Sequence, residues 1–174
     1  MAHPFGLSMP QSLITTNAPD GRSVFTQDEA SSHPNFKTSG FADLHVASSI
    51  PVDLTQDLAE TASFSAANKS MIAVQATGVC FRRTEQPPGG STPMHRTLTM
   101  DYGTVIEGEA ELLLDSGERR VLKAGDTIVQ RATMHQWFNR STTQWVRIVW
   151  VVFPIQPLEV NGQLLKGEGL EDGV

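Results

Sequence analysis

Hydrophobic and polar residues alternate along the second half of the chain with the period of two that is typical of β-strands. The pattern is clearest in GTVIEGEAELLLD, where Ala110, Leu112 and Leu114 fall on one face and acidic residues fall on the other. The stretch QWVRIVWVVF (residues 144–153) is almost continuously apolar, as expected of a strand covered on both faces. Turn sequences such as DSGE separate these segments. Many short strands joined by regular turns predict an all-β sandwich or barrel.

The first 65 residues are rich in Ser, Thr, Asn, Pro and Gly, which predicts short strands linked by loops. Turns are predicted at NAPDG (17–21) and SHPN (32–35), and DLTQDLAETA (53–62) predicts a short helix or turn. A hairpin is predicted around Asn161-Gly162. We therefore expect one domain over 1–174, with a core at about 70–155, an N-terminal arm at 1–69 and a C-terminal tail at 156–174.

Composition and charge narrow the class of protein and its partners. A length of 174 residues with 39% hydrophobic and 18% charged residues suits one globular domain. The formal net charge of −6 argues against nucleic acid or an anionic membrane as a partner. No apolar run approaches the ~20 residues of a membrane span, and the N-terminus lacks the features of a secretory signal.

The chain has a single cysteine, Cys80, so an intramolecular disulfide is excluded. This fits a reducing compartment, and we expect a cytoplasmic location. Because Cys80 lies within a predicted strand, we expect it to be a small buried hydrophobe rather than a reactive thiol.

Chemistry-bearing residues share faces on two of the predicted strands, because residues two apart project to the same side. Six of them have the parity to converge on one cavity, namely His95, Thr97, Asp101, His135, Trp137 and Asn139. Further lining is expected from Met94, Met134, Phe81 and the last strand. Such a cavity suits a flat, partly apolar small molecule as substrate.

Residues 89–139 resemble the cupin superfamily. Its first motif reads Gly, five residues, His-x-His, three or four residues, Glu, six residues, Gly. In this chain His95, Thr97, Asp101 and Gly108 stand at the positions of the two histidines, the glutamate and the last glycine. The second motif runs from a Gly-Asp turn through Pro to His and then, after three residues, Asn. Here it contains Gly125-Asp126, Arg131 in place of proline, His135 and Asn139, with a Gly-to-His spacing that is one residue short.

The segments HRTLTMDYG, GDTIVQRATMHQWFN and LITTNAPDGRSVF together resemble a small single-domain cupin subgroup, with the pattern HRTxxxDYG, found in bacteria and fungi. Its fungal members are similar to proteins of polyketide-type secondary metabolism. The resemblance implies a cupin jelly-roll (double-stranded β-helix) barrel of about six to eight strands, with extra N-terminal strands. It also implies a homodimer with exchanged edge strands.

The resemblance leaves a reduced set of metal ligands. Thr97 replaces the second histidine and Asp101 replaces the longer glutamate, so His95, Asp101 and His135 remain as the ligands for a divalent metal such as Fe, Zn or Mn. Two histidines and one carboxylate match the facial triad of non-haem iron enzymes. A metal-dependent cupin dioxygenase or related oxidoreductase is therefore one hypothesis, although a shorter carboxylate cannot simply reach the same ion.

The hypothesis that we prefer needs no cofactor. Asp101 paired with His95 or His135 in an apolar pocket could move a proton to or from carbon. Thr97 or Asn139 could then orient a substrate carbonyl. This predicts a lyase or isomerase that acts on a polyketide-like carbonyl or phenolic substrate by dehydration, decarboxylation, isomerisation or cyclisation. A non-catalytic ligand-binding cupin is the third alternative, because the fold does not choose the chemistry.

Overall fold

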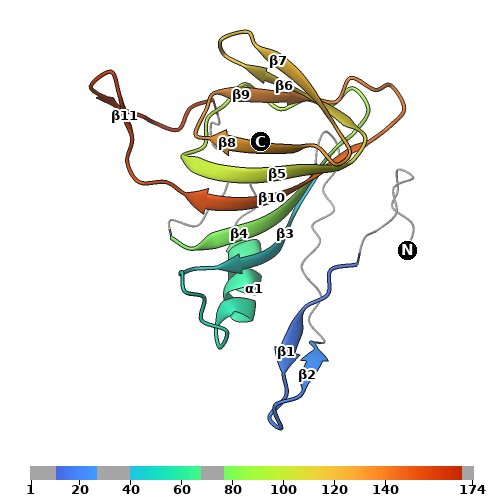
Figure 1. Cartoon of the computed structure of the whole chain (residues 1–174), viewed down its shortest axis with the longest axis vertical. Coiled ribbons are helices and arrows are strands. Elements are labelled where there is room, and N and C mark those ends of the chain that lie inside the picture. The colour runs from blue at the N-terminus through green and yellow to red at the C-terminus, as the bar shows by residue number, and fades with distance from the viewer. Residues whose placement is uncertain (1–10, 27–39, 68–76, 170–174) are drawn as a thin grey trace.

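The computed structural model describes residues 11–26, 40–67 and 77–169, and most of its strands form two facing antiparallel sheets (Figure 1). The larger sheet has the order β3-β4-β10-β5-β8 and the smaller sheet has the order β7-β6-β9. The larger sheet consists of β3 (Gly40–Ala47), β4 (Val79–Gln86), β5 (Thr99–Glu107), β8 (Thr127–Arg131) and β10 (Val146–Pro154). The smaller sheet consists of β6 (Glu109–Leu114), β7 (Arg119–Lys123) and β9 (His135–Phe138). The predicted all-β class is confirmed.

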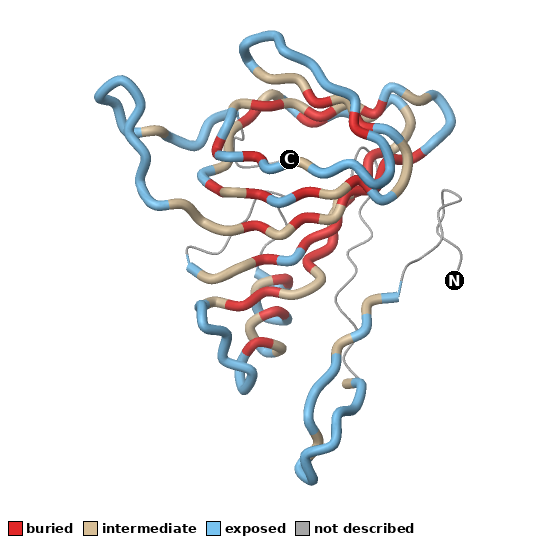
Figure 2. The backbone as a smooth tube through the Cα atoms, in the orientation of Figure 1, coloured by how far each residue is buried: buried red, intermediate tan, exposed pale blue. Residues whose placement is uncertain are grey.

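The core lies between the two sheets, where the buried faces of their strands meet (Figure 2). In β6, Ala110 and Leu112 are buried and Glu109 is exposed, which confirms the predicted alternation. In β10 the inward residues Ile148 and Trp150 are buried, whereas the outward valines are half-buried. The outer face of β10 is therefore only partly covered, in contrast to the expectation of a strand covered on both faces.

Helix α1 (Asp57–Ala67) packs on β3, the edge strand of the larger sheet. Thr61 accepts a hydrogen bond from the backbone amide of Val46 at 2.9 Å, and His45 Nε2 lies 2.9 Å from Asp57 Oδ2. The helix predicted at 53–62 thus begins four residues later and extends to Ala67. β3 belongs to the main sheet although it falls in the segment that the sequence assigned to an arm.

Two small hairpins lie outside the barrel. β1 (Thr15–Asn17) and β2 (Ser23–Phe25) pair around the turn predicted at 17–21, and they project away from the sheets (Figure 1). β11 (Glu159–Val160) and β12 (Gln163–Leu164) pair around the left-handed residues Asn161 and Gly162, which confirms that predicted hairpin. The turn predicted at 32–35 lies outside the described residues. Within the described ranges, no helix has the length and apolar character needed to cross a membrane.

Cys80 is only 1% exposed, in β4, and its thiol donates to Asp43 Oδ1 at 3.3 Å. Burial raises the pKa of this thiol to about 12. Since the thiolate is the nucleophilic form, Cys80 is inert at neutral pH, as predicted.

Candidate active site

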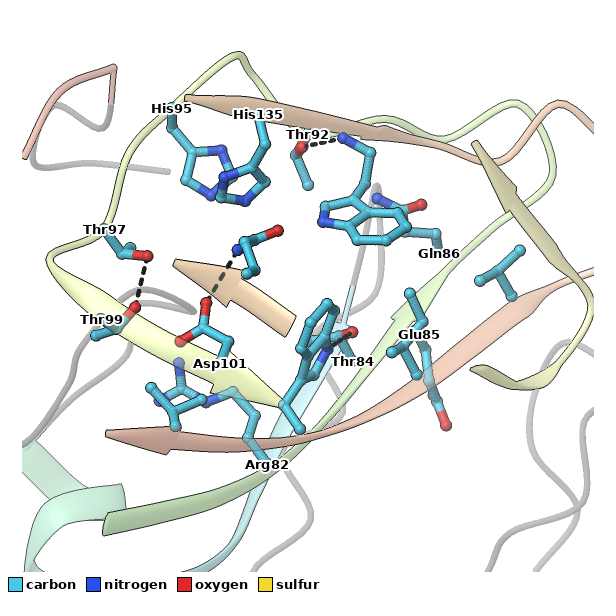
Figure 3. A pocket seen from close by; sticks show the side chains of 16 residues that line it. Arg82, Thr84, Glu85, Gln86, Thr92, His95, Thr97, Thr99, Asp101 and His135 are labelled. Carbon is cyan, nitrogen blue, oxygen red and sulfur yellow. Dashed lines mark hydrogen bonds between the residues drawn. The ribbon is translucent and has the colours of Figure 1, made fainter. Parts of the chain in front are cut away.

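A cavity of about 100 Å³ lies between the two sheets and is lined by residues of both (Figure 3). Its polar side comes from β4, β5, β8, β9 and the segment before β5, and much of its apolar side comes from β10. The lining residues are Arg82, Thr84, Glu85, Gln86, Thr92, His95, Thr97, Thr99, Asp101, Gln130, His135, Trp137, Val146, Ile148, Trp150 and Val152.

His95 and His135 come together because their backbones form an antiparallel pair. The amide of His95 donates to the carbonyl of His135, and the reverse bond is also present, both at 2.9 Å. Residues directly opposite in such a pair project to the same side of the sheet. The two ring centroids are consequently 4.2 Å apart, with 54° between the ring planes. Figure 3 shows both rings pointing into the cavity from the side opposite Asp101.

The hydrogen bonds of the two rings fix their tautomers. His95 Nδ1 lies 2.9 Å from the carbonyl of Pro93, and His135 Nδ1 lies 2.8 Å from the carbonyl of Thr133. A carbonyl only accepts, so each Nδ1 must carry the proton. In the neutral rings each Nε2 therefore holds a lone pair, and neither makes a hydrogen bond within the part of the chain that the structure describes.

Burial keeps both histidines neutral. The pKa of His135 is lowered from 6.5 to about 4, mainly by desolvation and also by the nearby His95, whereas its hydrogen bond to Thr133 opposes the shift. Desolvation also lowers the pKa of His95, although its hydrogen bond to Pro93 opposes the shift. At neutral pH the cavity thus contains two uncharged imidazoles, and these are suited to accept a proton or a hydrogen bond.

Asp101 is paired with Gln130 rather than with a histidine. The two residues are cross-strand neighbours in β5 and β8, and Gln130 Nε2 donates to Asp101 Oδ2 at 2.9 Å. Burial raises the pKa of Asp101, while its hydrogen bond with Gln130 and the charge of Arg82 act in the opposite direction. The predicted Asp101–His pair is therefore wrong for this structure: each Nδ1 is satisfied by a backbone carbonyl two residues earlier in the chain.

Two tryptophans form the aromatic wall of the cavity. Trp137 and Trp150 make an edge-to-face contact with 5.7 Å between ring centroids, and the indole of Trp150 donates to Thr84 at 2.9 Å. Gly103, opposite Trp150 in the sheet, leaves room for this ring, because a Cβ there would lie 2.4 Å from it. An apolar aromatic surface of this kind binds the flat face of a ligand.

Five of the predicted site residues line the cavity together, namely His95, Thr97, Asp101, His135 and Trp137. The predictions for four others are corrected by the structure. Asn139 is fully buried beside the cavity, where its amide donates to the carbonyls of Gln86, Pro87 and Gln144, so it anchors a loop.

Met94, Met134 and Phe81 also do not line the cavity. Phe81 is 39% exposed, because it has the outward parity on β4 next to inward Arg82. Met94 and Met134 precede the two histidines directly, and neighbouring residues in an extended segment project to opposite sides.

Sequence reasoning missed several lining residues. Gln130 shares the inward parity of Ile128 in GDTIVQR, and a polar residue at such a position could have indicated a functional group. Trp150 alternates with Ile148 and Val152 on β10, and all three line the cavity, in agreement with the lining expected from the last strand. Arg82 gave no comparable signal, because only the sheet pairing brings it near Asp101.

The polar side chains of the cavity, in the positions that the structure gives them, do not form a metal centre with three ligands. Within residues 11–26, 40–67 and 77–169, no group of three or more His, Cys, Asp or Glu side chains is arranged to hold an ion. Thr97 accepts a hydrogen bond from Thr99 at 2.9 Å, and the Asp101 carboxylate is held by Gln130. The two imidazole Nε2 atoms and Asp101 Oδ1 have no hydrogen-bond partner among the described residues, but they are not grouped around one ion position, whereas a catalytic zinc or facial-triad site uses three protein ligands.

The low pKa of His135 predicts a specific pH dependence of stability. The folded group binds a proton only near pH 4, whereas the unfolded group binds one near 6.5. The free energy of unfolding should therefore fall as the pH is lowered through this window, by on the order of 3 kcal/mol. Urea unfolding of the wild type and of His135→Gln at several pH values checks this. The free energy of unfolding of the variant should fall much less with decreasing pH than that of the wild type. An equal decline in both would contradict it.

Comparison with known proteins places this architecture among cupin-domain proteins. The profile of the family described as "Cupin domain" matches residues 82–152. The chain is 40% identical over 166 residues to the "Phomopsin biosynthesis cluster protein D" of Diaporthe leptostromiformis, covering 92% of this chain and 87% of the relative. It is 38% identical over 163 residues to the "Cupin-domain-containing oxidoreductase srdB" of Neurospora crassa, covering 92% and 81% of the two chains. Among solved structures it is similar to the polyketide cyclase RemF from Streptomyces resistomycificus, with 17% identity, a TM-score of 0.46, and 79% and 74% of the two chains covered.

Proposed function

The chain belongs to the cupin superfamily, and from this premise we propose that it is a small-molecule enzyme of secondary metabolism that acts as a lyase or isomerase. Relatives named for biosynthesis clusters support the metabolic setting. The paired neutral imidazoles in a partly apolar cavity support acid–base chemistry, and this is the observation that carries the proposal. The substrate class is a polyketide-like carbonyl or phenolic compound.

In this proposal His95 is the general base. An efficient base has a pKa near the working pH, and the pKa of His135, at about 4, is too low for this role. His95 Nε2 removes a proton from a carbon or hydroxyl of the substrate and later returns it to another atom. His135 stays neutral and accepts a hydrogen bond, and together the two rings hold the substrate against the tryptophan wall.

Thr97 and Asp101 assist through orientation. The Thr97 oxygen accepts a hydrogen bond from Thr99, so its own hydrogen is available to a substrate carbonyl. Donation there stabilises the negative charge that develops on an enolate oxygen. Asp101 acts through Gln130, whose amide it holds, and it is a positioning residue in this mechanism.

The mass of the product tests the reaction type. We expect an accumulated precursor in a producing strain that lacks this chain, and the purified protein should convert it to an isomer or to a product that has lost water or carbon dioxide. On the acid side, kcat/KM should fall only below the ordinary histidine pKa of 6.5, because burial lowers the pKa of His95 and the base works unprotonated. A product that differs by two hydrogens or by added oxygen would refute the non-redox reaction.

An oxidoreductase is the second candidate, and the names of several relatives favour it. In that case His95, Asp101 and His135 would be the ligands of a divalent metal, which requires these side chains to move closer together than they lie in this structure. Metal analysis of protein purified without chelators distinguishes the candidates: stoichiometric metal that is lost together with activity in His95→Ala supports the oxidoreductase. A chain that binds the precursor but does not convert it would be a ligand-binding cupin.

We also propose that the chain forms a homodimer. The isolated β1–β2 hairpin is exposed at all six strand residues, and two-stranded hairpins are at best marginally stable alone. Its apolar residues Leu13 and Phe25 are 67% and 66% exposed. A second copy could cover them, and sedimentation equilibrium should then give about twice the mass of one chain. Deletion of residues 1–26 should yield a folded monomer; a wild-type monomer would contradict the proposal.

A further inference from the structure

Gln130 is a cavity residue whose role the acid–base mechanism does not explain fully. It is 6% exposed and lines the cavity from β8. Its amide nitrogen donates to Asp101, but its Oε1 is buried and has no hydrogen-bond partner among the described residues. Buried amide oxygens in native proteins are almost always satisfied. A donor from outside the chain would satisfy this one.

The pairing with Asp101 determines which hydrogen-bonding atom of Gln130 remains for a ligand. A carboxylate only accepts hydrogen bonds, so the amide nitrogen of Gln130 must face Asp101. The amide oxygen is consequently directed away from Asp101 and is kept as an acceptor. Asp101, at 7% exposed, is itself held in place by the β5–β8 pairing. The acceptor is therefore built into the sheet and is not a mobile surface group.

The rest of the cavity favours the same ligand chemistry. The Nε2 atoms of His95 and His135 are also acceptors, and the aromatic wall of Trp137 and Trp150 suits a flat ring. The cavity volume of about 100 Å³ is of the order of the ~150 Å³ that holds benzene in an engineered cavity. Its enclosed part thus matches one ring that carries hydrogen-bond donors.

We propose that Gln130 determines substrate specificity by accepting a hydrogen bond at Oε1 from a hydroxyl group on a single-ring planar ligand of the phenol or enol class. This deepens the proposed function, because it takes the cavity as the substrate site. A ligand whose hydroxyl is methylated has no hydrogen to donate and leaves Oε1 unsatisfied. Rejection of such ligands is the distinguishing consequence.

Binding of two small probes, phenol and anisole, tests this proposal by isothermal titration calorimetry. The wild type should bind phenol more tightly, and Gln130→Met should reduce the ratio of the two dissociation constants by about tenfold, the effect of one buried hydrogen bond. Methionine keeps the length of the side chain and removes the acceptor. Gln163→Met, in the exposed β12, is the matched control and should keep the wild-type ratio.

A second variant covers the case in which Gln130→Met does not fold. In Asp101→Asn the partner can donate as well as accept, so Gln130 can present either amide atom and the ratio should fall by about threefold. Equal binding of both probes by the wild type, no binding of either, or an unchanged ratio in the folded variants overturns the proposal. The probes do not react, so their binding is independent of catalysis. If the chain proves not to be an enzyme but still prefers phenol through Gln130, this inference stands although the proposed function fails.

Discussion

Replacing His95 with glutamine is expected to lower kcat/KM for the cognate substrate by about 10²- to 10⁴-fold, the range for removal of a general base. Glutamine keeps the polar character of the position and cannot take up a proton near neutral pH. The backbone pair with His135 should persist, because it uses only main-chain atoms. Steady-state kinetics of the purified variant measure the loss, and circular dichroism checks that the fold is kept.

His45→Gln is the matched control for that experiment. His45 is a partly buried histidine that contacts Asp57 on α1, and it does not line the cavity. Its replacement should leave kcat/KM within about threefold of the wild type, since remote substitutions seldom affect the chemical step. If His95→Gln retains the wild-type rate while His135→Gln loses it, the two histidines have exchanged roles. If both variants retain it, the acid–base mechanism is refuted.

Replacing Arg147 with methionine is expected to lower the free energy of unfolding by about 3–5 kcal/mol, as is usual when one partner of a buried ion pair is removed. Arg147 is 2% exposed and lies opposite Glu85 on one side and Glu107 on the other. Its guanidinium contacts Glu85 at 2.7 Å and Glu107 at 3.2 Å. Without it, the Glu85 carboxylate, also 2% exposed, loses its 2.7 Å contact with a guanidinium, and its contact with Arg83 is longer, at 3.3 Å.

Thermal and urea unfolding of the variant measure this loss, which corresponds to a decrease in Tm of very roughly 6–20 °C for a chain of this size. Arg120→Met is the control, because Arg120 is exposed and reaches Glu118 only at 4.0 Å. Its effect should stay within about 0.5 kcal/mol. The double variant Arg147→Met with Glu85→Gln should recover part of the stability. A stability of Arg147→Met equal to that of the control would mean that the buried network contributes nothing.

The fold was largely predictable from the pattern of residues. The alternation around Ala110 and Leu112 determines which face of β6 is buried, and a turn such as Asn161-Gly162 requires residues that tolerate a positive φ. These are local properties of the chain, so they can be read without knowing what lies across the barrel. Helix α1 was placed too early, because its position depends on contacts with β3 such as Thr61 to Val46.

The candidate site was predictable only in part. Parity along an extended chain was sufficient to bring His95, Thr97 and Asp101 to one side, and the structure places all three on the cavity. Parity failed for Asn139, because this residue lies beyond the end of β9, where the backbone turns and the side chain anchors a loop. It also failed for Phe81, since nothing in the local pattern showed which face of β4 is the inner one.

The sequence by itself determined that two histidines and one carboxylate occur at spacings that direct them into a β-barrel. Only the tertiary structure decided how they are connected. The pairing of β5 with β8 brings Gln130 to Asp101, and the bridge between His95 and His135 brings their ring centroids within 4.2 Å of each other. Burial between the sheets then keeps both rings neutral. Strand register and desolvation arise from contacts between segments far apart in the chain, so no local pattern encodes them.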